Sequence, residues 1–303
     1  MQEELDWNVA VFCMNEETRL EGCLNSVTAA LSGQRSLVSV ILNGSSDRSR
    51  DIACRFVRAG HPVEVFEIDA ADKSNSINQF FYRLRSPARS YGGVDGYAHI
   101  GPHSFQAMQD RLAQDTHAVA ATGVCTNGRT MRLATEATLT VGGRLHGQLH
   151  AFRRSFLDRM VARGIKLPLG TYWGDGLLGS MAAHDLDALT QPWDNARIRG
   201  VAAATYEIPQ ASLLNPDDIR RHFRRRVRQM RGRIQNAAIK DVIYKSGYEG
   251  LPDDADDMVA SYVATHGLPK VGWPDRVFQR LAMRQRRAAR DPVSLVPRRV
   301  TPS

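Results

Sequence analysis

The sequence contains no long hydrophobic run. None of its apolar segments approaches the roughly 18 residues that a membrane-spanning helix needs, which argues against an integral membrane protein. The first residues, Met1 to Asp6, are acidic and do not fit a secretion signal. Cysteine is scarce, and the four cysteines show no Cys-x-x-Cys spacing, so free thiols in a reducing cytosol are the simplest interpretation. We therefore expect a cytoplasmic protein.

With 303 residues, the chain is long enough for one large domain or two small ones. Hydrophobic residues make up 43% and charged residues 24%, which is typical of a soluble globular protein. The net charge of +8 favours anionic partners such as phosphates, nucleic acid or an anionic membrane surface. The alternative is a solvated basic surface, and the clustering of the charges must decide between the two.

Strand-like and helix-like patterns alternate in the first half of the chain. Short apolar segments predict strands, and apolar residues at helical spacing between them predict helices. This order indicates an α/β fold with a mostly parallel sheet and helices on both faces. No Gly-x-Gly-x-x-Gly follows the first strand, which argues against the dinucleotide-binding version of such a sheet. The expected strands cover 8–14, 37–42, 62–68, a short segment at Asp95, and 117–123.

Polar side chains follow four of the expected strands. They are Asn15, Asn43 with Gly44, the segment 69–72, and Asp95. Ligands of parallel α/β sheets bind beyond the carboxyl ends of the strands. We therefore expect these four positions to form one site.

The pattern changes after Gly142. We expect a strand over 144–152, a helix over 153–163, an apolar helix after Asp175 and a last strand over 201–208. Asn215-Pro216 then predicts the start of another helix. Further on we expect a helix over 254–265 and a basic tail (Arg284, Arg286, Arg287 and Arg290) with a disordered, proline-containing end.

The helix predicted from Asn215 is unusually basic. Repulsion along one helix makes such a cluster costly unless anions lie nearby, so a diphosphate, an anionic membrane or a lipid phosphate is an expected partner. The alternative is a solvated basic face for at least half of the cluster. Its arginines are Arg220, Arg221, Arg224, Arg225, Arg226, Arg228, Arg231 and Arg233.

Six segments, in this order along the chain, resemble motifs of the family 2 glycosyltransferases, which have the GT-A fold. The resemblance covers about residues 8 to 233. The segments are Val9 to Glu17 (opening strand and Asn-Glu-Glu), Ile41 to Asp47 (Asp-Gly-Ser-x-Asp loop), Lys73 to Asn78 (Gly-Lys-x-x-Ala-x-Asn), Val94 to Tyr97 (Asp-x-Asp), Gly174-Asp175 (Glu-Asp), and Arg225 to Gln229 (Gln-x-x-Arg-Trp).

The resemblance implies a GT-A-like, Rossmann-like domain over 1–240. Its nucleotide-sugar-binding half would be 1–124 and its acceptor-binding half 125–240, with a helical, basic extension over 241–303. The implied activity is hexosyl transfer from a nucleotide-sugar donor to a hydroxyl group of a saccharide or lipid-linked acceptor, with inversion. A divalent metal, Mg²⁺ or Mn²⁺, and a peripheral contact with the inner face of an anionic membrane are further expectations. Nucleic acid is not an expected partner.

Three positions depart from the family pattern. Leu42 stands where many members have an aspartate that reads the base. Tyr97 replaces the second aspartate of the Asp-x-Asp motif, the one expected to hold the metal, so the metal requirement is open. The tryptophan of the arginine motif is missing. Because Tyr97 replaces a metal-binding aspartate, Arg225 and Arg228 are expected to carry part of the diphosphate charge.

Two carboxylates are the main candidates for chemistry. Asp95 is expected to bind ribose or a metal that bridges the diphosphate; the alternative is a turn residue after Gly93. Asp175 is expected to be the general base that deprotonates the acceptor, with its pKa raised by desolvation near Trp173. The alternative, compatible with the first, is a helix N-cap.

The remaining candidates concern donor binding. Asn15 and Glu16 either line the base pocket or start the first helix. Asn43 is expected to bond a base edge or the ribose, and Tyr97 to face the donor. Lys73 either contacts a phosphate or is a solvated charge.

Two functions of other classes stay open. A nucleotidyltransferase on a similar sheet would want a glycine-rich, basic first loop, whereas Asn15-Glu16-Glu17 is acidic. A basic nucleic-acid-binding module without catalysis would interleave aromatics with its arginines, and 220–233 contain only Phe223. A family member that binds donor without turnover is a further alternative, because Tyr97 departs from the motif.

Overall fold

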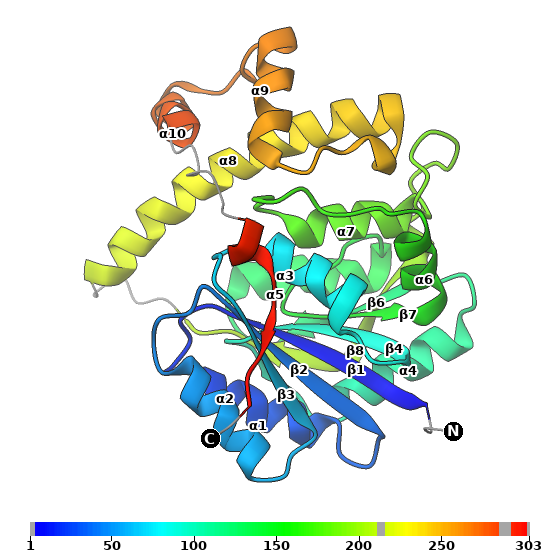
Figure 1. The fold of residues 1–303 in the computed structure, drawn as a ribbon. Coiled ribbons are helices and arrows are strands. Elements are labelled where there is room, and N and C mark those ends of the chain that lie inside the picture. The colour runs from blue at the N-terminus through cyan, green and yellow to red at the C-terminus, as the bar shows by residue number, and fades with distance from the viewer. Residues whose placement is uncertain (1–3, 211–215, 285–291, 302–303) are drawn as a thin grey trace.

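A computed structural model describes residues 4–210, 216–284 and 292–301. Its centre is a nine-stranded sheet with the order β5-β8-β6-β7-β4-β1-β2-β3-β9 (Figure 1). The strands are β1 (Leu5–Cys13), β2 (Ser36–Asn43), β3 (Val63–Ile68), β4 (Ala88–Asp95), β5 (His99–Ile100), β6 (Ala120–Cys125), β7 (Leu149–Arg153), β8 (Ile198–Glu207) and β9 (Arg298–Arg299).

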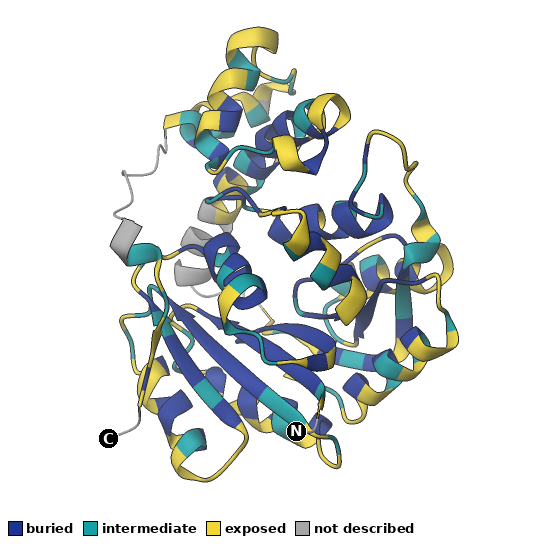
Figure 2. Cartoon of the chain, turned by 45° about the vertical axis from the view of Figure 1, so that its right-hand side comes forward, coloured by how far each residue is buried: buried dark blue, intermediate teal, exposed yellow. Residues whose placement is uncertain are grey.

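Helices cover both faces of this sheet. Apolar residues of α1, α2 and α4 form one buried cluster with one face of the strands. Those of α3, α6, α7, α8 and α9 form a second cluster on the other face. Figure 2 shows mostly buried strands, with the exposed residues concentrated on the surrounding helices and loops. The helices are α1 (Leu20–Ala30), α2 (Ser49–Arg58), α3 (Lys73–Gln79), α4 (Ser104–Gln114), α5 (Arg129–Val141), α6 (Arg154–Ala162), α7 (Gly174–Ala183), α8 (Pro216–Ser246), α9 (Ala255–His266) and α10 (Trp273–Arg284).

The strands β3, β2, β1 and β4 form the parallel core of the sheet. Val11 of β1 pairs with Val40 of β2 on one side and with Val94 of β4 on the other. Strands buried on both faces need continuous apolar runs, which explains why residues 9–13 are fully or almost fully buried. The prediction of an α/β fold with a mostly parallel sheet is confirmed, and the carboxyl ends of β1, β2 and β4 meet at one edge.

For two elements beyond this core, the sequence pattern gives an incomplete prediction or none. Strand β7 inserts between β4 and β6 and is antiparallel to both, although the sequence pattern predicts only its presence. Helix α5 lies where no element was expected, in a segment whose apolar residues Met131, Leu133 and Leu139 are diluted by threonines. Pairing partners distant in the sequence decide strand direction, and local patterns do not reveal them.

The expectation of a disordered, proline-containing end is wrong for residues 292–300. This segment forms a short 3₁₀ helix, Pro292–Leu295, and then β9, which pairs antiparallel with β3. It is the red segment that runs beside β3 in Figure 1. Arg298 forms two hydrogen bonds of 2.8 and 2.6 Å with Asp69. Three arginines of the predicted basic tail, Arg286, Arg287 and Arg290, lie outside the described residues.

Helix α8 contains 31 residues and crosses position 240, where the sequence places the end of the first domain. Its buried residues Ile234, Ala238 and Ile243 belong to the same cluster as α6 and α7. The division at 240 stays a prediction, as do the two halves before it. Within the described parts of the chain, no helix has the length and hydrophobicity required to cross a membrane.

Candidate active site

The loops after β1 and β2 are tied to each other by hydrogen bonds. Asn15 has a left-handed backbone (φ 55°), and its Oδ1 accepts a bond of 2.8 Å from the Ser46 N–H. The Asn15 N–H donates to Ser45 Oγ at 3.2 Å, and the Glu17 N–H donates to Asp47 Oδ2 at 2.9 Å. Helix α1 begins at Leu20, and the Leu20 N–H donates to the Glu16 carbonyl at 2.8 Å, so Glu16 lies in the turn that leads into this helix. The two loops form one structured edge.

Asn43 is the last residue of β2 and directly precedes the second of these loops. Its side chain is 4% exposed, and its Oδ1 has no hydrogen-bond partner among the described residues. Gly44 follows with a φ of 69°, and a Cβ there would lie 2.7 Å from that of Ala71. A buried oxygen without a partner costs roughly 1–3 kcal/mol, which makes Asn43 Oδ1 a candidate for a further hydrogen bond.

Asp95, the last residue of β4, is buried at the centre of a polar cluster. Its Oδ1 forms an ion pair with the Lys73 ammonium. Its Oδ2 accepts a hydrogen bond of 2.8 Å from the Tyr97 hydroxyl. Gln148 Nε2 contacts both that hydroxyl, at 3.1 Å, and Asp95 Oδ2, at 3.4 Å. Asp95 ends the strand and also begins the turn that follows, because its carbonyl accepts the Ala98 N–H at 2.9 Å.

Lys73 is the first residue of α3, and its backbone is fixed by the preceding Asp72. The Asp72 carboxylate caps this helix by accepting the Ser74 N–H at 3.0 Å, and its other oxygen accepts the Gly170 N–H at 2.9 Å. Burial acts to lower the pKa of the Lys73 ammonium, but the carboxylates of Asp95 and Asp175 outweigh burial and raise this pKa. Lys73 is therefore a charged group inside the site.

Asp175 lies in the first turn of α7, and the structure brings it to the same cluster. Its Oδ2 accepts the Gly147 N–H at 3.3 Å. An ideal Cβ on Gly147 would lie 3.2 Å from that oxygen and 3.4 Å from Lys73 Nζ, so both charged groups lie against Gly147. Trp173 is the residue at the N-cap position of α7, which makes the N-cap alternative for Asp175 wrong.

The electrostatic environment makes Asp175 easier to protonate than an ordinary aspartate. Burial raises the pKa of its carboxyl group, and the negative charge of Asp95 raises it further. The positive charge of Lys73 and the backbone N–H groups of Gly147 and Gly176 oppose this shift without cancelling it. A carboxylate with a raised pKa has the properties of a general base.

The residues of the cluster do not fit a metal centre built by the protein. Hard divalent cations require several oxygen ligands, preferably charged ones. Asp95 is the carboxylate of the Asp-x-Asp position, and both its oxygens are engaged by Lys73 and Tyr97. The described part of the chain contains no group of three or more His, Cys, Asp or Glu side chains suited to a metal. The Lys73 ammonium lies where a cation would have to approach Asp95.

The predicted diphosphate residues lie on α8, and both are exposed. The Arg228 guanidinium lies 5.9 Å from the centre of the Tyr172 ring. Neither Arg225 nor Arg228 forms a described ion pair with Asp95 or Asp175. Their role stays a prediction. The side chains of Arg220, Arg221 and Arg224 lie outside the described residues.

Three other arginines of the basic helix are paired within the protein. Arg226 and Arg233 both bond Asp275 of α10, at 2.9 and 3.1 Å. Arg231 pairs with Asp256 of α9. These pairs join α8 to the two helices that follow it, which explains part of the arginine cluster without an external anion.

Sequence reasoning missed several residues of the site. Gln148 is one, because a single glutamine before a strand carries no recognisable signal. His150 is another; its ring lies so close to Gly93 that a Cβ there would be 2.3 Å from Nε2. Burial and the charge of Lys73 lower the pKa of His150 to about 4, so it is neutral at physiological pH.

No protein-family model and no curated protein matches this chain. Solved structures do. The mannosyltransferase PcManGT from Pyrobaculum calidifontis, in complex with GDP-Man and Mn²⁺, superposes with a TM-score of 0.58 at 16% identity, covering 92% of this chain and 80% of that chain.

Two further structures are similar. TarS from S. aureus, in complex with UDP-GlcNAc, gives a TM-score of 0.52 at 14% identity over 92% of this chain and 79% of that chain. Glucosyl-3-phosphoglycerate synthase from Mycobacterium tuberculosis, with Mn²⁺, UDP-Glc and phosphoglyceric acid, gives 0.52 at 16% identity over 82% and 81%. At these identities the similarity establishes the fold: the mostly parallel open sheet with its covering helices is that of the GT-A glycosyltransferases.

Proposed function

We propose that this protein is a glycosyltransferase that moves a sugar from a nucleotide-sugar donor to an acceptor hydroxyl group. The observation that carries the proposal is the cluster of Asp95, Lys73 and Asp175 at the carboxyl edge of a GT-A sheet. The structures it resembles were solved with GDP-Man, UDP-GlcNAc or UDP-Glc. Membership of family 2 and a cytoplasmic location belong to the proposal.

The donor would lie along the edge formed by the first two loops. The free Oδ1 of Asn43 is suited to accept an N–H of the nucleobase, and Asn15 and Glu16 border the same edge. Asp95 and Tyr97, at the end of β4, would then contact the ribose and the diphosphate of this donor. Lys73 supplies a positive charge that stabilises the negative charge developing on the leaving diphosphate.

The acceptor hydroxyl would approach from the side of Asp175. Its oxygen forms a bond to the anomeric carbon while the bond from that carbon to the diphosphate breaks, and the electron pair leaves with the nucleoside diphosphate. Asp175 accepts the hydroxyl proton. A single displacement by the acceptor oxygen, from the face opposite the leaving diphosphate, inverts the anomeric configuration, which makes inversion part of this proposal.

A divalent metal is not assigned a protein-built site in this mechanism. Two of the similar structures contain Mn²⁺. A bound divalent cation would neutralise diphosphate charge. Here the Lys73 ammonium is already paired with Asp95. We propose that Lys73 neutralises the diphosphate charge and that Arg225 and Arg228 are additional cations for the donor.

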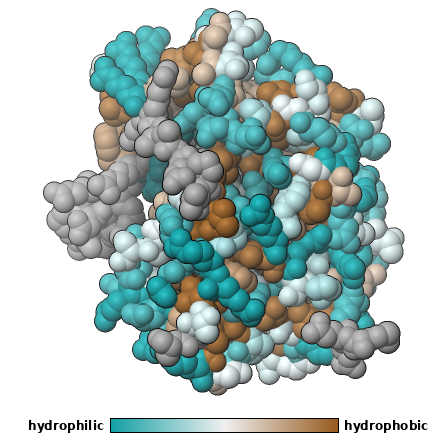
Figure 3. All heavy atoms as spheres, in the orientation of Figure 1, coloured by the Kyte–Doolittle hydropathy of each residue, from teal (hydrophilic) through white to brown (hydrophobic). Residues whose placement is uncertain are grey.

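The two competing functions are less well supported. A nucleotidyltransferase would need a basic loop after β1, whereas Glu16 and Glu17 follow it, and Glu16 is bonded to Arg19 at 3.1 Å. A nucleic-acid-binding face would need unpaired cations along α8, whereas Arg226, Arg231 and Arg233 are paired with aspartates. A peripheral membrane contact stays a prediction; on the face shown in Figure 3, hydrophobic residues are interspersed with hydrophilic ones.

A thermal-shift screen against a panel of nucleotide sugars, with and without Mn²⁺, tests the proposal. A ligand that binds only the folded state stabilises it by about 2.7 kcal/mol at 100 times its Kd, so one donor class should raise the melting temperature clearly. The free sugars without nucleotide serve as controls. If no nucleotide sugar and no nucleoside diphosphate raises the melting temperature, the proposal is wrong.

A further inference from the structure

A cavity of about 420 Å³ opens beside Asp175, between α7 and α8. This volume lies in the range of about 300 to 1,000 Å³ that small-molecule sites occupy. Asp175 contributes to its wall and is the one carboxylate among its lining residues. Because Asp175 also borders Lys73, one carboxylate separates the cavity from the proposed donor site.

Three aromatic side chains line this cavity and are accessible to solvent. Trp173 is 37% exposed, Trp193 47% and Tyr244 53%. Large apolar side chains are normally buried, so three accessible aromatic rings around one cavity call for a ligand. Aromatic faces bind the C–H faces of sugar rings because those faces are apolar while the ring edges carry hydroxyl groups.

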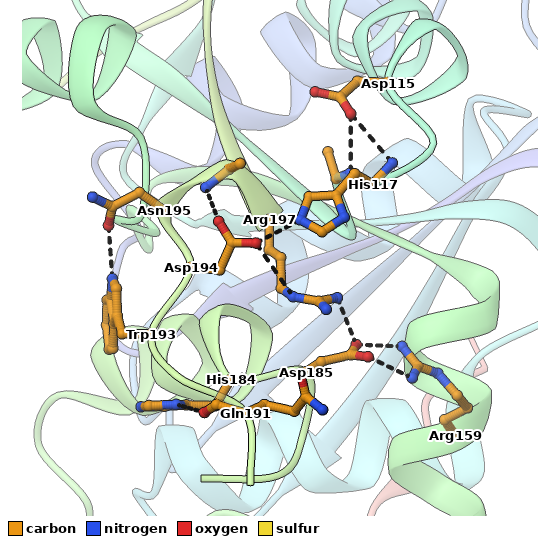
Figure 4. A network of polar contacts seen from close by, with 12 residues as sticks. Asp115, His117, Arg159, His184, Asp185, Gln191, Trp193, Asp194, Asn195 and Arg197 are labelled. Carbon is orange, nitrogen blue, oxygen red and sulfur yellow. Dashed lines mark hydrogen bonds and ion pairs between the residues drawn. The ribbon is translucent and has the colours of Figure 1, made fainter.

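The Trp193 ring is held in place by its neighbours, as Figure 4 shows. Its Nε1–H donates to Asn195 Oδ1 at 2.7 Å, and the His184 ring meets it edge to face with centroids 5.4 Å apart. His184 is itself fixed by a bond of 2.7 Å to the Gln191 carbonyl. A fixed ring loses little entropy when a ligand stacks on it.

The segment that carries Trp193 is fixed as well. Asp185 at its start binds Arg159 through both carboxylate oxygens, at 3.1 and 2.6 Å, and also Arg197, at 3.2 Å. Asp194 is bonded to His117 at 2.5 Å (Figure 4). The loop is therefore anchored at both ends, and its tryptophan is presented on a rigid support.

Polar groups complete the wall on the α8 side. Asn236 and Lys240 are both exposed there, and neither has a described hydrogen-bond or ion-pair partner. An amide and an ammonium group supply donors and an acceptor for hydroxyl groups. Aromatic faces combined with a few hydrogen-bonding groups suit a saccharide better than a lipid chain, which would need an apolar channel without them.

We propose that this cavity is the acceptor site and that the acceptor is a saccharide, stacked on Trp193 with one hydroxyl group directed at Asp175. The assignment of the hydroxyl to Asp175 rests on the proposed function. Saccharide binding in the cavity does not, because it requires no donor and no turnover.

A printed oligosaccharide array with neutral and acidic sugars tests the proposal on the full-length protein. The wild type is expected to bind a subset of the saccharides. Trp193→Ala should weaken that binding at least about ten-fold, the order of one aromatic contact. Trp193→Phe keeps a stacking face and should retain most of it. Trp273→Ala is the matched control, because Trp273 is 80% exposed and lies outside the cavity.

Two further measurements keep the outcomes separate. Tyr244→Ala should reduce the same binding, and it replaces Trp193→Ala if that variant melts below the assay temperature. Vesicles of phosphatidylglycerol and phosphatidylcholine test a lipid phosphate, which we expect not to compete with the saccharide.

The proposal is overturned if the wild type binds no saccharide, if Trp193→Ala and Trp273→Ala bind alike, or if only vesicles bind. Failure of the proposed function would show instead as saccharide binding without nucleotide binding.

Discussion

Asp175 is a residue whose ionised form is less favourable in the folded protein than in water, because burial raises the pKa of its carboxyl group. Such a group is costly for stability and useful for proton transfer. The same carboxylate faces Lys73 on one side and the cavity on the other. The residue therefore links donor and acceptor in the proposed mechanism.

The substitution Asp175→Asn separates a catalytic role from a structural one. Asparagine keeps the shape and accepts the Gly147 N–H, but it cannot take a proton. We expect kcat to fall by roughly two to four orders of magnitude, the usual size of general-base catalysis, with donor Kd almost unchanged. Steady-state kinetics and a donor titration on the same preparation measure both. A near-normal kcat would remove Asp175 from the mechanism.

The pH dependence of kcat follows from the same pKa shift. The base acts in its ionised form, so kcat should rise with pH, and the rise should lie above the ordinary aspartate value of about 3.9. For stability the sign is opposite. A raised folded pKa means that stability is lost as pH rises through it, so Asp175→Asn should melt no lower than the wild type at neutral pH. An acid limb at an ordinary aspartate pKa would contradict this account.

The Lys73 ammonium is the positive charge next to Asp95 and Asp175. If its ammonium stabilises the leaving diphosphate, Lys73→Gln should lower kcat by roughly 10²–10³, as removal of one charge-stabilising group does. Activity should persist in excess EDTA. Lys166→Gln is the matched control, because the Lys166 ammonium lies 5.2 Å from the centre of the Tyr82 ring and forms no described contact with Asp95. Complete loss of activity in EDTA, fully restored by micromolar Mn²⁺, would contradict the role of Lys73.

The sequence predicts single residues where a motif and a strand end coincide. Asp95 at the end of one strand and Lys73 after another are placed at the same edge in this way, and the structure brings the two side chains together. Gln148, Trp193 and Tyr244 were not found, because each is one polar or aromatic residue in a segment without a motif. Only the packing of distant segments brings them to the site.

At the scale of elements, the approach of α8 to the Tyr172–Trp173 loop determines the shape of the cavity. Gly232 allows that approach: a Cβ there would lie 2.8 Å from a Tyr172 ring carbon and 3.0 and 3.1 Å from the Trp173 ring. Gln235, one turn further, fixes the loop by accepting the Tyr172 N–H at 2.8 Å and donating to the Gly170 carbonyl at 3.0 Å.

A pair of glycine substitutions tests this contact. Glycine to alanine inside a helix normally stabilises by about 0.5–1 kcal/mol. Gly22→Ala in α1, where no atom lies within 4 Å of the new Cβ, should show that gain. Gly232→Ala should lack this gain in stability, because the new Cβ requires the Tyr172–Trp173 loop to move. The same movement should weaken saccharide binding. Urea unfolding of the two variants makes the comparison, and an equal gain in both would contradict the close approach.

Element prediction succeeds for the parallel strands and for the helices between them, since buried strands and amphipathic helices have distinct periods. It gives no direction for β7, and it does not predict the strand β9 near the end of the chain. Strand β9 consists of Arg298 and Arg299, two basic residues that no pattern would place in a sheet. They pair with β3 through the backbone and with Asp69 and Glu64 through their side chains.

At the scale of the whole molecule, the last residues close one edge of the sheet and reach the site. The Asn75 amide donates to the Leu295 carbonyl at 2.9 Å, and the Ala70 N–H donates to the Ser294 carbonyl at 2.9 Å. Both bonds lie next to Lys73, so removal of residues 292–303 should lower the melting temperature and loosen donor binding. The double variant Arg298→Ala/Arg299→Ala is a milder control. Unchanged donor affinity after truncation would show that this segment does not support the site.

Asp175 borders both the proposed donor edge and the aromatic cavity, and the proposed function requires that a sugar moves between them. The most direct test incubates the full chain with the nucleotide sugar that gives the largest thermal shift and measures nucleoside diphosphate release with and without a bound saccharide. We expect the saccharide to accelerate release and to appear with one added sugar by mass spectrometry, and we expect Asp175→Asn to abolish both. If the donor binds and no sugar reaches any saccharide or water, the protein is not a glycosyltransferase.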